Sequence, residues 1–202
     1  MNLTIILTLF PKENYNGCMS LFPRAEETVY EFVKNENLIR HMHAVSEAMR
    51  QYALKFGEDE DKWAAVGMLH DFDWEIHPDS SRHPSAGVEI LKARGWSEEI
   101  TRAILSHADY TGVKRETMME KTLYACDELC GFIVACALVQ PDRKIALLTT
   151  QSVIRKLKKK EFARNVNRED IYKGADEIGV DLTVHIEFVL NSLQKIHCKL
   201  RL

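Results

Sequence analysis

The sequence predicts an all-α fold, and two observations support this class. From Arg24 onward, apolar residues recur at the three-to-four-residue spacing of an amphipathic helix, and no strand-like alternation persists. Short polar segments interrupt this pattern at intervals, among them "FGEDED", "ARGWS" and "QPDR". With 202 residues, 46% of them hydrophobic and 28% charged, the chain is long enough for one well-buried core.

The helical pattern divides into nine segments, each ended by polar residues, Gly or Pro. In "GWSEEI", Ser97 is suited to cap a helix, because acidic residues follow it on the first turn, where the helix dipole favours them. The expected helices cover residues 25–34, 36–56, 59–70, 85–94, 97–108, 116–139, 144–159, 168–178 and 181–197.

These helices predict one main unit with an extension at each end. Residues 24–140 form the main helical domain, and residues 141–202 add helices that pack on the same domain. We expect residues 1–23 to be an N-terminal extension, either disordered or upstream of the true start at Met19. The apolar stretch "LTIILTLF" in this extension is too short to span a bilayer, and no Lys or Arg precedes it as in a signal peptide.

The net charge and the cysteine content limit which partners and which cellular compartment we expect for this protein. The formal net charge is -3, so the balance predicts neither a nucleic-acid partner nor a membrane partner. The basic run "RKLKKK" spreads around a helix and is expected in solvent. Three of the five cysteines lie in the apolar run "LYACDELCGFIVACALV" and read as small buried hydrophobic residues. This usage is typical of a reducing compartment, so we expect a cytoplasmic protein.

Polar side chains of the kind that bind metals interrupt the apolar faces of two early helices. His41 lies on the apolar stripe of 36–56, whereas His43 falls on its polar side and is expected in solvent. In "WAAVGMLHD", His70 continues the apolar stripe and Asp71 follows at the helix end. An unpaired charge directed inward at this position would cost several kcal/mol, on the order of 2–7 for a polar group.

Two later helices repeat the feature. His107 ends the apolar stripe of 97–108, and Asp127 lies within the apolar stripe of 116–139. No Lys or Arg shares the stripe of Asp127, although a buried Asp is almost never found without a partner. A single inward histidine is more often a hydrogen-bonded core residue than a ligand, and His185 is a candidate for that role. The full set of histidines and acids instead favours a divalent metal ion, which accepts both imidazole nitrogen and carboxylate oxygen.

The residues in this order resemble the signature of the HD superfamily of metal-dependent phosphohydrolases, an all-helical fold. The segments "RHPSAGVEILKARGW" and "ILSHAD" look like the additional histidine pair of the binuclear members. The span 25–195 is similar to small bacterial hydrolases of the HDIG type, although "HDFD" replaces the four-letter HDIG form here. The six positions that carry the resemblance are His41, His70, Asp71, His83, His107 and Asp127.

The resemblance implies two bound divalent transition metal ions, from among Fe, Mn, Zn, Co and Ni. It makes Asp71 the bridge between the ions, with His83 and His107 around one of them. The other ion would be held by His41, His70 and Asp127. The implied reaction is hydrolysis of a phosphoester or phosphoanhydride in a small nucleotide-like molecule, with a metal-activated water as nucleophile and Asp71 at the reaction centre.

Nearby charged side chains are candidates for contacts with the substrate. Arg82, Lys114 and Arg115 are suited to bind phosphate, and solvated surface charge is the alternative for each. Glu75 and Asp73, just after the "HD" pair, could give a proton to the leaving group, with simple solvation in a loop as the alternative. Two other functions stay open: a di-iron oxygenase of the HD type, and a nucleotide-sensing HD domain without catalysis.

Overall fold

A computed structural model describes residues 20–202 and confirms the all-α class, because the described part of the chain contains helices and no strand. The predictions for residues 1–19 concern a part of the chain that lies outside the described residues. In chain order the helices are α1 (Leu21–Phe32), α2 (Glu36–Phe56), α3 (Glu60–Leu69), α4 (Ser85–Ala93), α5 (Glu98–Ser106), η1 (Asp109–Thr111), α6 (Met118–Leu138), η2 (Ile145–Leu147), α7 (Thr150–Leu157), α8 (Arg168–Glu177), α9 (Leu182–Lys195) and α10 (His197–Leu200).

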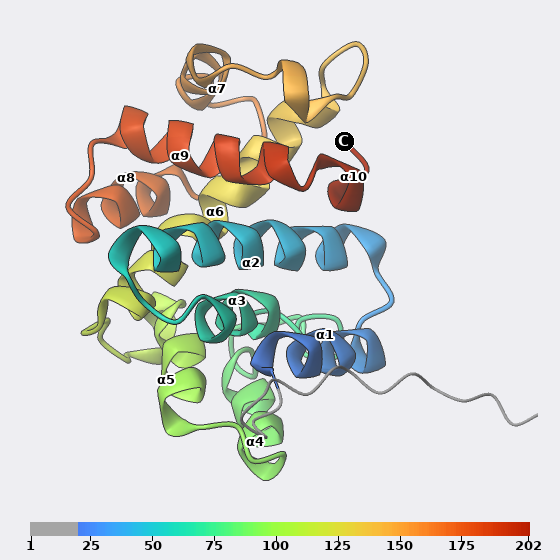
Figure 1. Ribbon diagram of the computed structural model, residues 1–202, viewed down its shortest axis with the longest axis vertical. Helices are drawn as coiled ribbons and strands as arrows, with labels where there is room; N and C mark the ends of the chain where they lie inside the picture. Colours follow the sequence, from blue (N-terminus) through green and yellow to red (C-terminus); the bar gives the residue numbers. More distant parts are fainter. Residues whose placement is uncertain (1–19) are drawn as a thin grey trace, which may run out of the picture.

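The helices are stacked around α2, which runs across the middle of the molecule (Figure 1). Helices α1 and α3 lie on one side of α2 and α9 lies on the other, while α6 packs against α2, α8 and α9. One continuous apolar core runs through the described helices, from Ala25 in α1 to Leu200 in α10. None of the described helices is both long enough and apolar enough to cross a membrane.

Side-chain caps fix where the helices begin. The Asn35 and Asp59 side chains accept hydrogen bonds from the first backbone N–H groups of α2 and α3. Ser97 caps α5, as the sequence predicts. Thr117 and Glu120 form a capping box at the start of α6. These caps set the register of the helices that deliver the polar residues described below.

The expected helix over 144–159 is interrupted in the structure. Residues Ile145–Leu147 form a single 3-10 turn, and α7 begins only at Thr150. The reason is local, because Thr149 has an extended backbone and its hydroxyl accepts the N–H of Ser152. The apolar spacing continues across this break and conceals it in the sequence.

Two glycines allow helix backbones to touch. A Cβ on Gly67 in α3 would lie 2.8 Å from the Cα of Ser46 in α2, so only glycine fits at this crossing. The Ser46 hydroxyl also donates to the Ala64 carbonyl at 2.8 Å. In the same way, a Cβ on Gly174 in α8 would lie 2.5 Å from the Cα of Ala125 in α6. The first contact sets α3 against α2, and the second sets α8 against α6.

The expectation that His43 lies in solvent is wrong. Its side chain is 5% exposed, and its Nε2 lies 3.1 Å from the hydroxyl of Tyr30 in α1. Helices α1 and α10 cover this face of α2. Burial and then the charge of Lys199 in α10 lower the pKa of His43 to about 4. The helix periodicity shows the stripe that faces the main core, but not the second face that later helices cover.

Candidate metal centre

The structure brings all six sequence-predicted metal ligands together, although five separate segments supply them. The histidine of α2 and the aspartate of α6 come from helix interiors. The other four lie at helix ends or in the loop before α4. The six residues are His41 on α2, His70 and Asp71 after α3, His83 before α4, His107 at the end of α5, and Asp127 on α6.

His70 and His107 are presented in the same way. Each is the residue that ends its helix, and each places Nδ1 against the backbone carbonyl three residues earlier, at 2.8 Å for Gly67 and 2.5 Å for Ile104. A carbonyl accepts only, so Nδ1 carries the proton in both rings and Nε2 is left with a lone pair. The helix ends thus fix both imidazoles in the tautomer that binds a metal through Nε2.

His83 reaches the same state through a carboxylate. Its Nδ1 lies 2.8 Å from Oδ1 of Asp73, and Oδ2 of Asp73 accepts the backbone N–H of Gly87 at 3.0 Å. Both side chains are almost fully buried, at 3% and 1% exposure. From the sequence, Asp73 is either a general acid or a solvated loop residue. The structure instead makes it the residue that orients His83.

Asp71 lies at the centre of the cluster, and its two oxygens face different histidines. Oδ2 lies 3.7 Å from Nε2 of His41 and 3.5 Å from Nε2 of His70. Oδ1 lies 3.4 Å from Nε2 of His83 and 3.6 Å from Nε2 of His107. One carboxylate therefore faces two separate pairs of imidazole nitrogens, which is the arrangement of a bridging ligand.

Asp127 completes the side of the cluster nearest α2. Its Oδ1 lies 3.0 Å from Nε2 of His41 and 3.4 Å from Nε2 of His70. The two imidazoles approach each other closely, with their Nε2 atoms 3.2 Å apart. The convergence of these lone pairs needs a shared positive centre, either a proton or a metal ion.

The pKa values show how the cluster is charged without a metal. Burial lowers the pKa of His70, but the carboxylates of Asp71 and Asp127 outweigh burial and raise this pKa to about 9. Burial raises the pKa of Asp127, yet His70 and His41 hold it well below its usual range. Burial lowers the pKa of His107 and outweighs the carboxylates of Asp127 and Asp71, which raise it.

Two groups of three residues have the geometry to hold a divalent ion. Within each group the ligand atoms all lie within 4.8 Å of one another. Nitrogen and carboxylate oxygen in these numbers suit Zn, Mn, Fe, Co or Ni. Because the Nδ1 sides of His70, His83 and His107 are already bonded, their Nε2 atoms are available, and the residues fit the metal. The groups are His41, His70 and Asp71, and Asp71, His83 and His107.

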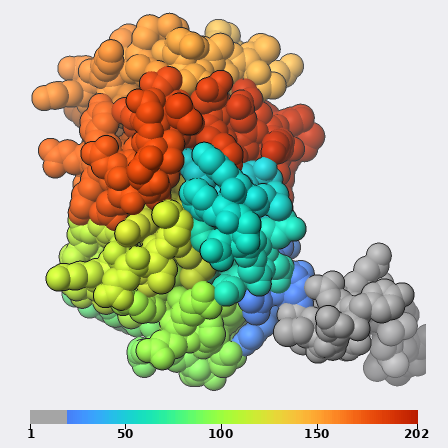
Figure 2. All heavy atoms as spheres, turned by 60° about the vertical axis from the view of Figure 1, so that its left-hand side comes forward, coloured from blue at the N-terminus to red at the C-terminus, as the bar shows by residue number. Residues whose placement is uncertain are grey.

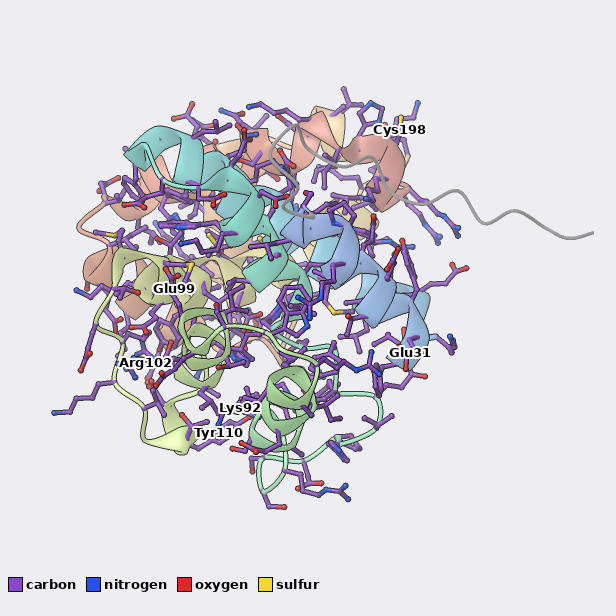
Figure 3. The ribbon with its side chains drawn as sticks, turned by 60° about the horizontal axis from the view of Figure 1, so that its bottom comes forward. Glu31, Lys92, Glu99, Arg102, Tyr110 and Cys198 are labelled. Atoms are coloured by element: carbon purple, nitrogen blue, oxygen red, sulfur yellow. The ribbon has the colours of Figure 1, made fainter. Side chains whose placement is uncertain are left out.

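A cavity of about 600 Å³ opens in front of these ligands. Its wall includes three aromatic side chains, Trp74, Tyr110 and Tyr124, and three further acids, Asp109, Glu128 and Asp170. Figure 3 labels Tyr110 on the short η1 segment, which follows α5 with its labelled Glu99 and Arg102. Acids near the site shift the neighbouring pKa values. Burial, then Asp71, raises the pKa of Tyr110 to about 12, and burial, then Asp127, raises that of Glu128 to about 7.

The predicted proton donor Glu75 and the predicted phosphate contact Arg82 do not line this cavity. The Glu75 carboxylate accepts the backbone N–H groups of Lys34 and Asn35, both at 2.9 Å, and thereby supports the start of α2. Both bonds end on Oε2, and Glu75 does not line the cavity, so the structure does not bring the predicted general acid to the metal ligands. Arg82 is exposed and lies beside His77, with 3.4 Å between guanidinium nitrogen and Nε2.

Lys114 and Arg115 line a neighbouring hollow instead, together with Lys121 and Lys173. Arg115 pairs with Asp109 and with Glu177 of α8, each at 2.7 Å, and its guanidinium stacks on the ring of Tyr124. The segment before α6 and the helix α8 lie side by side in Figure 2, in yellow-green and orange-red. Arg115 therefore supports the cavity wall from behind and does not face the metal ligands, which corrects its predicted role.

The cavity contains functional candidates that the sequence pattern does not reveal. Asp170 lies on α8, 43 residues after Asp127 in the sequence, and Tyr110 lies on a short turn without helical periodicity. Trp74 follows the "HD" pair closely, and its ring meets the edge of His83 with 4.8 Å between the ring centres. The short distance in sequence from the "HD" pair could have marked Trp74 as a candidate. The sequence does not distinguish a tryptophan that lines a cavity from one that packs in the core.

Comparison with known proteins agrees with this geometry. Residues 38–130 match the family model described as HD domain, and this range includes all six clustered ligands. The chain is 28% identical over 168 residues to Ribonuclease Y of Lawsonia intracellularis (strain PHE/MN1-00), covering 76% of this chain and 30% of that relative. The chain thus spans less than a third of the length of this relative. No solved structure matches the chain significantly.

Proposed function

We propose that this chain is a metal-dependent phosphohydrolase with two divalent metal ions at the clustered ligands, because residues 38–130 match the HD domain family. The observation that carries the proposal is the position of Asp71, whose oxygens face His41 and His70 on one side and His83 and His107 on the other. When bound, two such ions supply a nucleophilic water at neutral pH and neutralise charge on phosphoryl oxygens. The substrate that we propose is a small nucleotide-like phosphoester or phosphoanhydride.

The side chains have distinct tasks in this proposal. His70, His83 and His107 present Nε2 because backbone carbonyls and Asp73 hold their Nδ1 protons. Asp71 keeps the two ligand groups at a fixed separation, since one carboxylate belongs to both. The aromatic side chains Trp74, Tyr110 and Tyr124 form part of the cavity wall beside the place where the phosphoryl group would lie. No protein nucleophile is required.

The test combines metal analysis with hydrolysis. Protein purified without chelator is analysed for metal and assayed on p-nitrophenyl phosphate, bis(p-nitrophenyl) phosphate and a panel of nucleotides. We expect about two transition metal ions per chain, and activity that a chelator removes and added metal restores. Asp71→Asn should lose most of the metal and the activity, whereas the exposed Asp176→Asn should keep both. Full hydrolysis by metal-free protein or by Asp71→Asn would contradict the proposal.

A further inference from the structure

The cavity in front of the metal ligands differs from an ordinary polyphosphate site. Within residues 20–202, no Lys or Arg lines it. Sites that bind several phosphates usually present such cations to each phosphate group. Apart from the metal ligands and Asp109, its wall consists mainly of aromatic, amide and carboxylate side chains. They are Trp74, Tyr110, Tyr124, Glu128, Asn167 and Asp170.

Glu128 and Asp170 are the two carboxylates of this wall that have no cationic partner among the described residues. Asn167 links them, since its backbone N–H donates to Glu128 at 3.2 Å and its amide donates to Asp170 at 2.8 Å. The hydroxyl of Tyr124 also donates to Asp170 at 2.8 Å. Each carboxylate oxygen has a second lone pair. The wall is thus oriented in advance to accept further hydrogen bonds from a bound molecule.

The negative charges of the cavity wall determine which chemical groups a bound molecule can place against it. Ions held by the clustered ligands would neutralise the charge of one phosphoryl group, but a second phosphate in this cavity would face Glu128 and Asp170, and no Lys or Arg of the described residues lines the cavity. Repulsion between like charges is stronger in a partly buried site than in bulk water, because the effective dielectric constant is lower, so this placement disfavours a second phosphate. N–H donors on the leaving group would instead meet acceptors that are already in place. Exposed aromatic rings at Trp74 and Tyr110 offer surfaces on which a planar base can stack.

We propose that the substrate is a nucleoside monophosphate whose base carries an exocyclic amino group, and that Glu128 and Asp170 recognise the N–H donors of that base. This inference rests on the proposed function, since it assigns the phosphate to the metal ligands. It adds the number of phosphates and the chemistry of the leaving group.

The neighbouring basic hollow is the competing destination for a second phosphate. It contains Lys114, Arg115, Lys121 and Lys173, but Arg115 and Lys173 already pair with Asp109 at 2.7 Å. Asp109 lines both the hollow and the cavity. A phosphate chain that ran from the metal ligands to the hollow would pass this carboxylate, so the geometry favours a single phosphate.

The experiment ranks ligands by equilibrium binding to manganese-loaded protein, and by hydrolysis where it occurs. The matched ligands are AMP against ATP, which differ in phosphates, and AMP or GMP against IMP, which lacks the exocyclic amino group. We expect AMP to bind more tightly than ATP, and AMP or GMP to bind at least about tenfold more tightly than IMP. Asp170→Asn and Glu128→Gln should each reduce the preference over IMP. Glu169→Gln, an exposed change on the same helix, should leave it intact.

Three results would overturn the inference. One is ATP binding as tightly as AMP, above all if Lys114→Ala or Lys121→Ala removes that affinity. Another is equal binding of AMP, GMP and IMP, and the third is no measurable binding of any monophosphate. Failure of the proposed function is recognised separately, because the protein would then hydrolyse neither nucleotides nor bis(p-nitrophenyl) phosphate, while the binding order still decides the inference.

Discussion

Asp73 Oδ1 lies 2.8 Å from Nδ1 of His83, and both side chains are buried. We therefore expect Asp73→Asn to lower metal affinity by about 10-fold to 100-fold, because the amide orients His83 less well and makes its ring less basic. Titration with manganese or zinc measures the affinity. Asp176→Asn serves as the control, since it removes one exposed carboxylate. Unchanged affinity in Asp73→Asn would show that His83 needs no orienting partner.

The two metal groups share only Asp71, so one should survive loss of the other. We expect the double variant His83→Ala, His107→Ala to bind about one ion per chain instead of about two, and to lose hydrolysis by orders of magnitude. Elemental analysis of the folded variant gives the stoichiometry. A variant that keeps two ions and full activity would leave a mononuclear centre. Loss of all metal would show that the two groups depend on each other.

His43 lies on α2, the helix that carries His41, but it belongs to neither group of candidate metal ligands. We expect His43→Ala to keep the wild-type metal content, and to lower the free energy of unfolding by about 1–2 kcal/mol, because it removes a buried ring bonded to Tyr30. Chemical denaturation and elemental analysis measure the two effects. A large loss of metal would mean that the covered face of α2 also supports the ligands.

His185 makes stability depend on pH. Tyr52 donates its hydroxyl proton to Nδ1 at 2.6 Å, and Nε2 donates to the carbonyl of Ala125 at 2.9 Å, so the folded state holds a neutral ring. Burial lowers the pKa of His185 to about 4, below its unfolded value of about 6.5. This contribution is therefore fully present above pH 6.5 and is lost as the pH falls towards 4.

The measurement compares wild type with His185→Gln. The difference between their free energies of unfolding should shrink by about 3 kcal/mol between pH 7 and pH 4, because only the wild type must bind a proton on unfolding. A difference that stays constant across this range would mean that the folded protein accommodates the charged ring.

Gly67 allows α3 to touch α2. We expect Gly67→Ala to destabilise the protein by about 1–3 kcal/mol, because its Cβ would lie 2.8 Å from the backbone of Ser46. Gly131→Ala is the matched control. Its Cβ would meet only the ring of His41 at 3.8 Å, and alanine favours a helix interior by about 1 kcal/mol. Equal stability of the two variants would show that α3 can shift away from α2.

The sequence predicted most helices within a few residues, because apolar spacing and capping residues both act over short distances. Inward histidines and unpartnered acids on apolar faces also pointed to five of the clustered residues, and the resemblance to the HD superfamily added His83, which lies in a loop without helical periodicity. The sequence did not show that Asp73 orients His83 or that Glu75 bonds the residues before α2. Both relationships depend on how loops fold back on helices. The buried side of His43 and the wall residue Asp170 likewise depend on helices far along the chain.

The contact of Gly174 with Ala125 would couple the proposed base selectivity to the stability of the C-terminal helices. Asp170 lies one helical turn before Gly174, and Ala125 also supplies the carbonyl that His185 binds. No side chain separates the two backbones, so α6 and α8 already pack as closely as their backbones allow. Any change that widens the cavity from this side must lift α8 off α6. A variant with room for a larger base would therefore become less stable, even though the altered residue never touches the ligand.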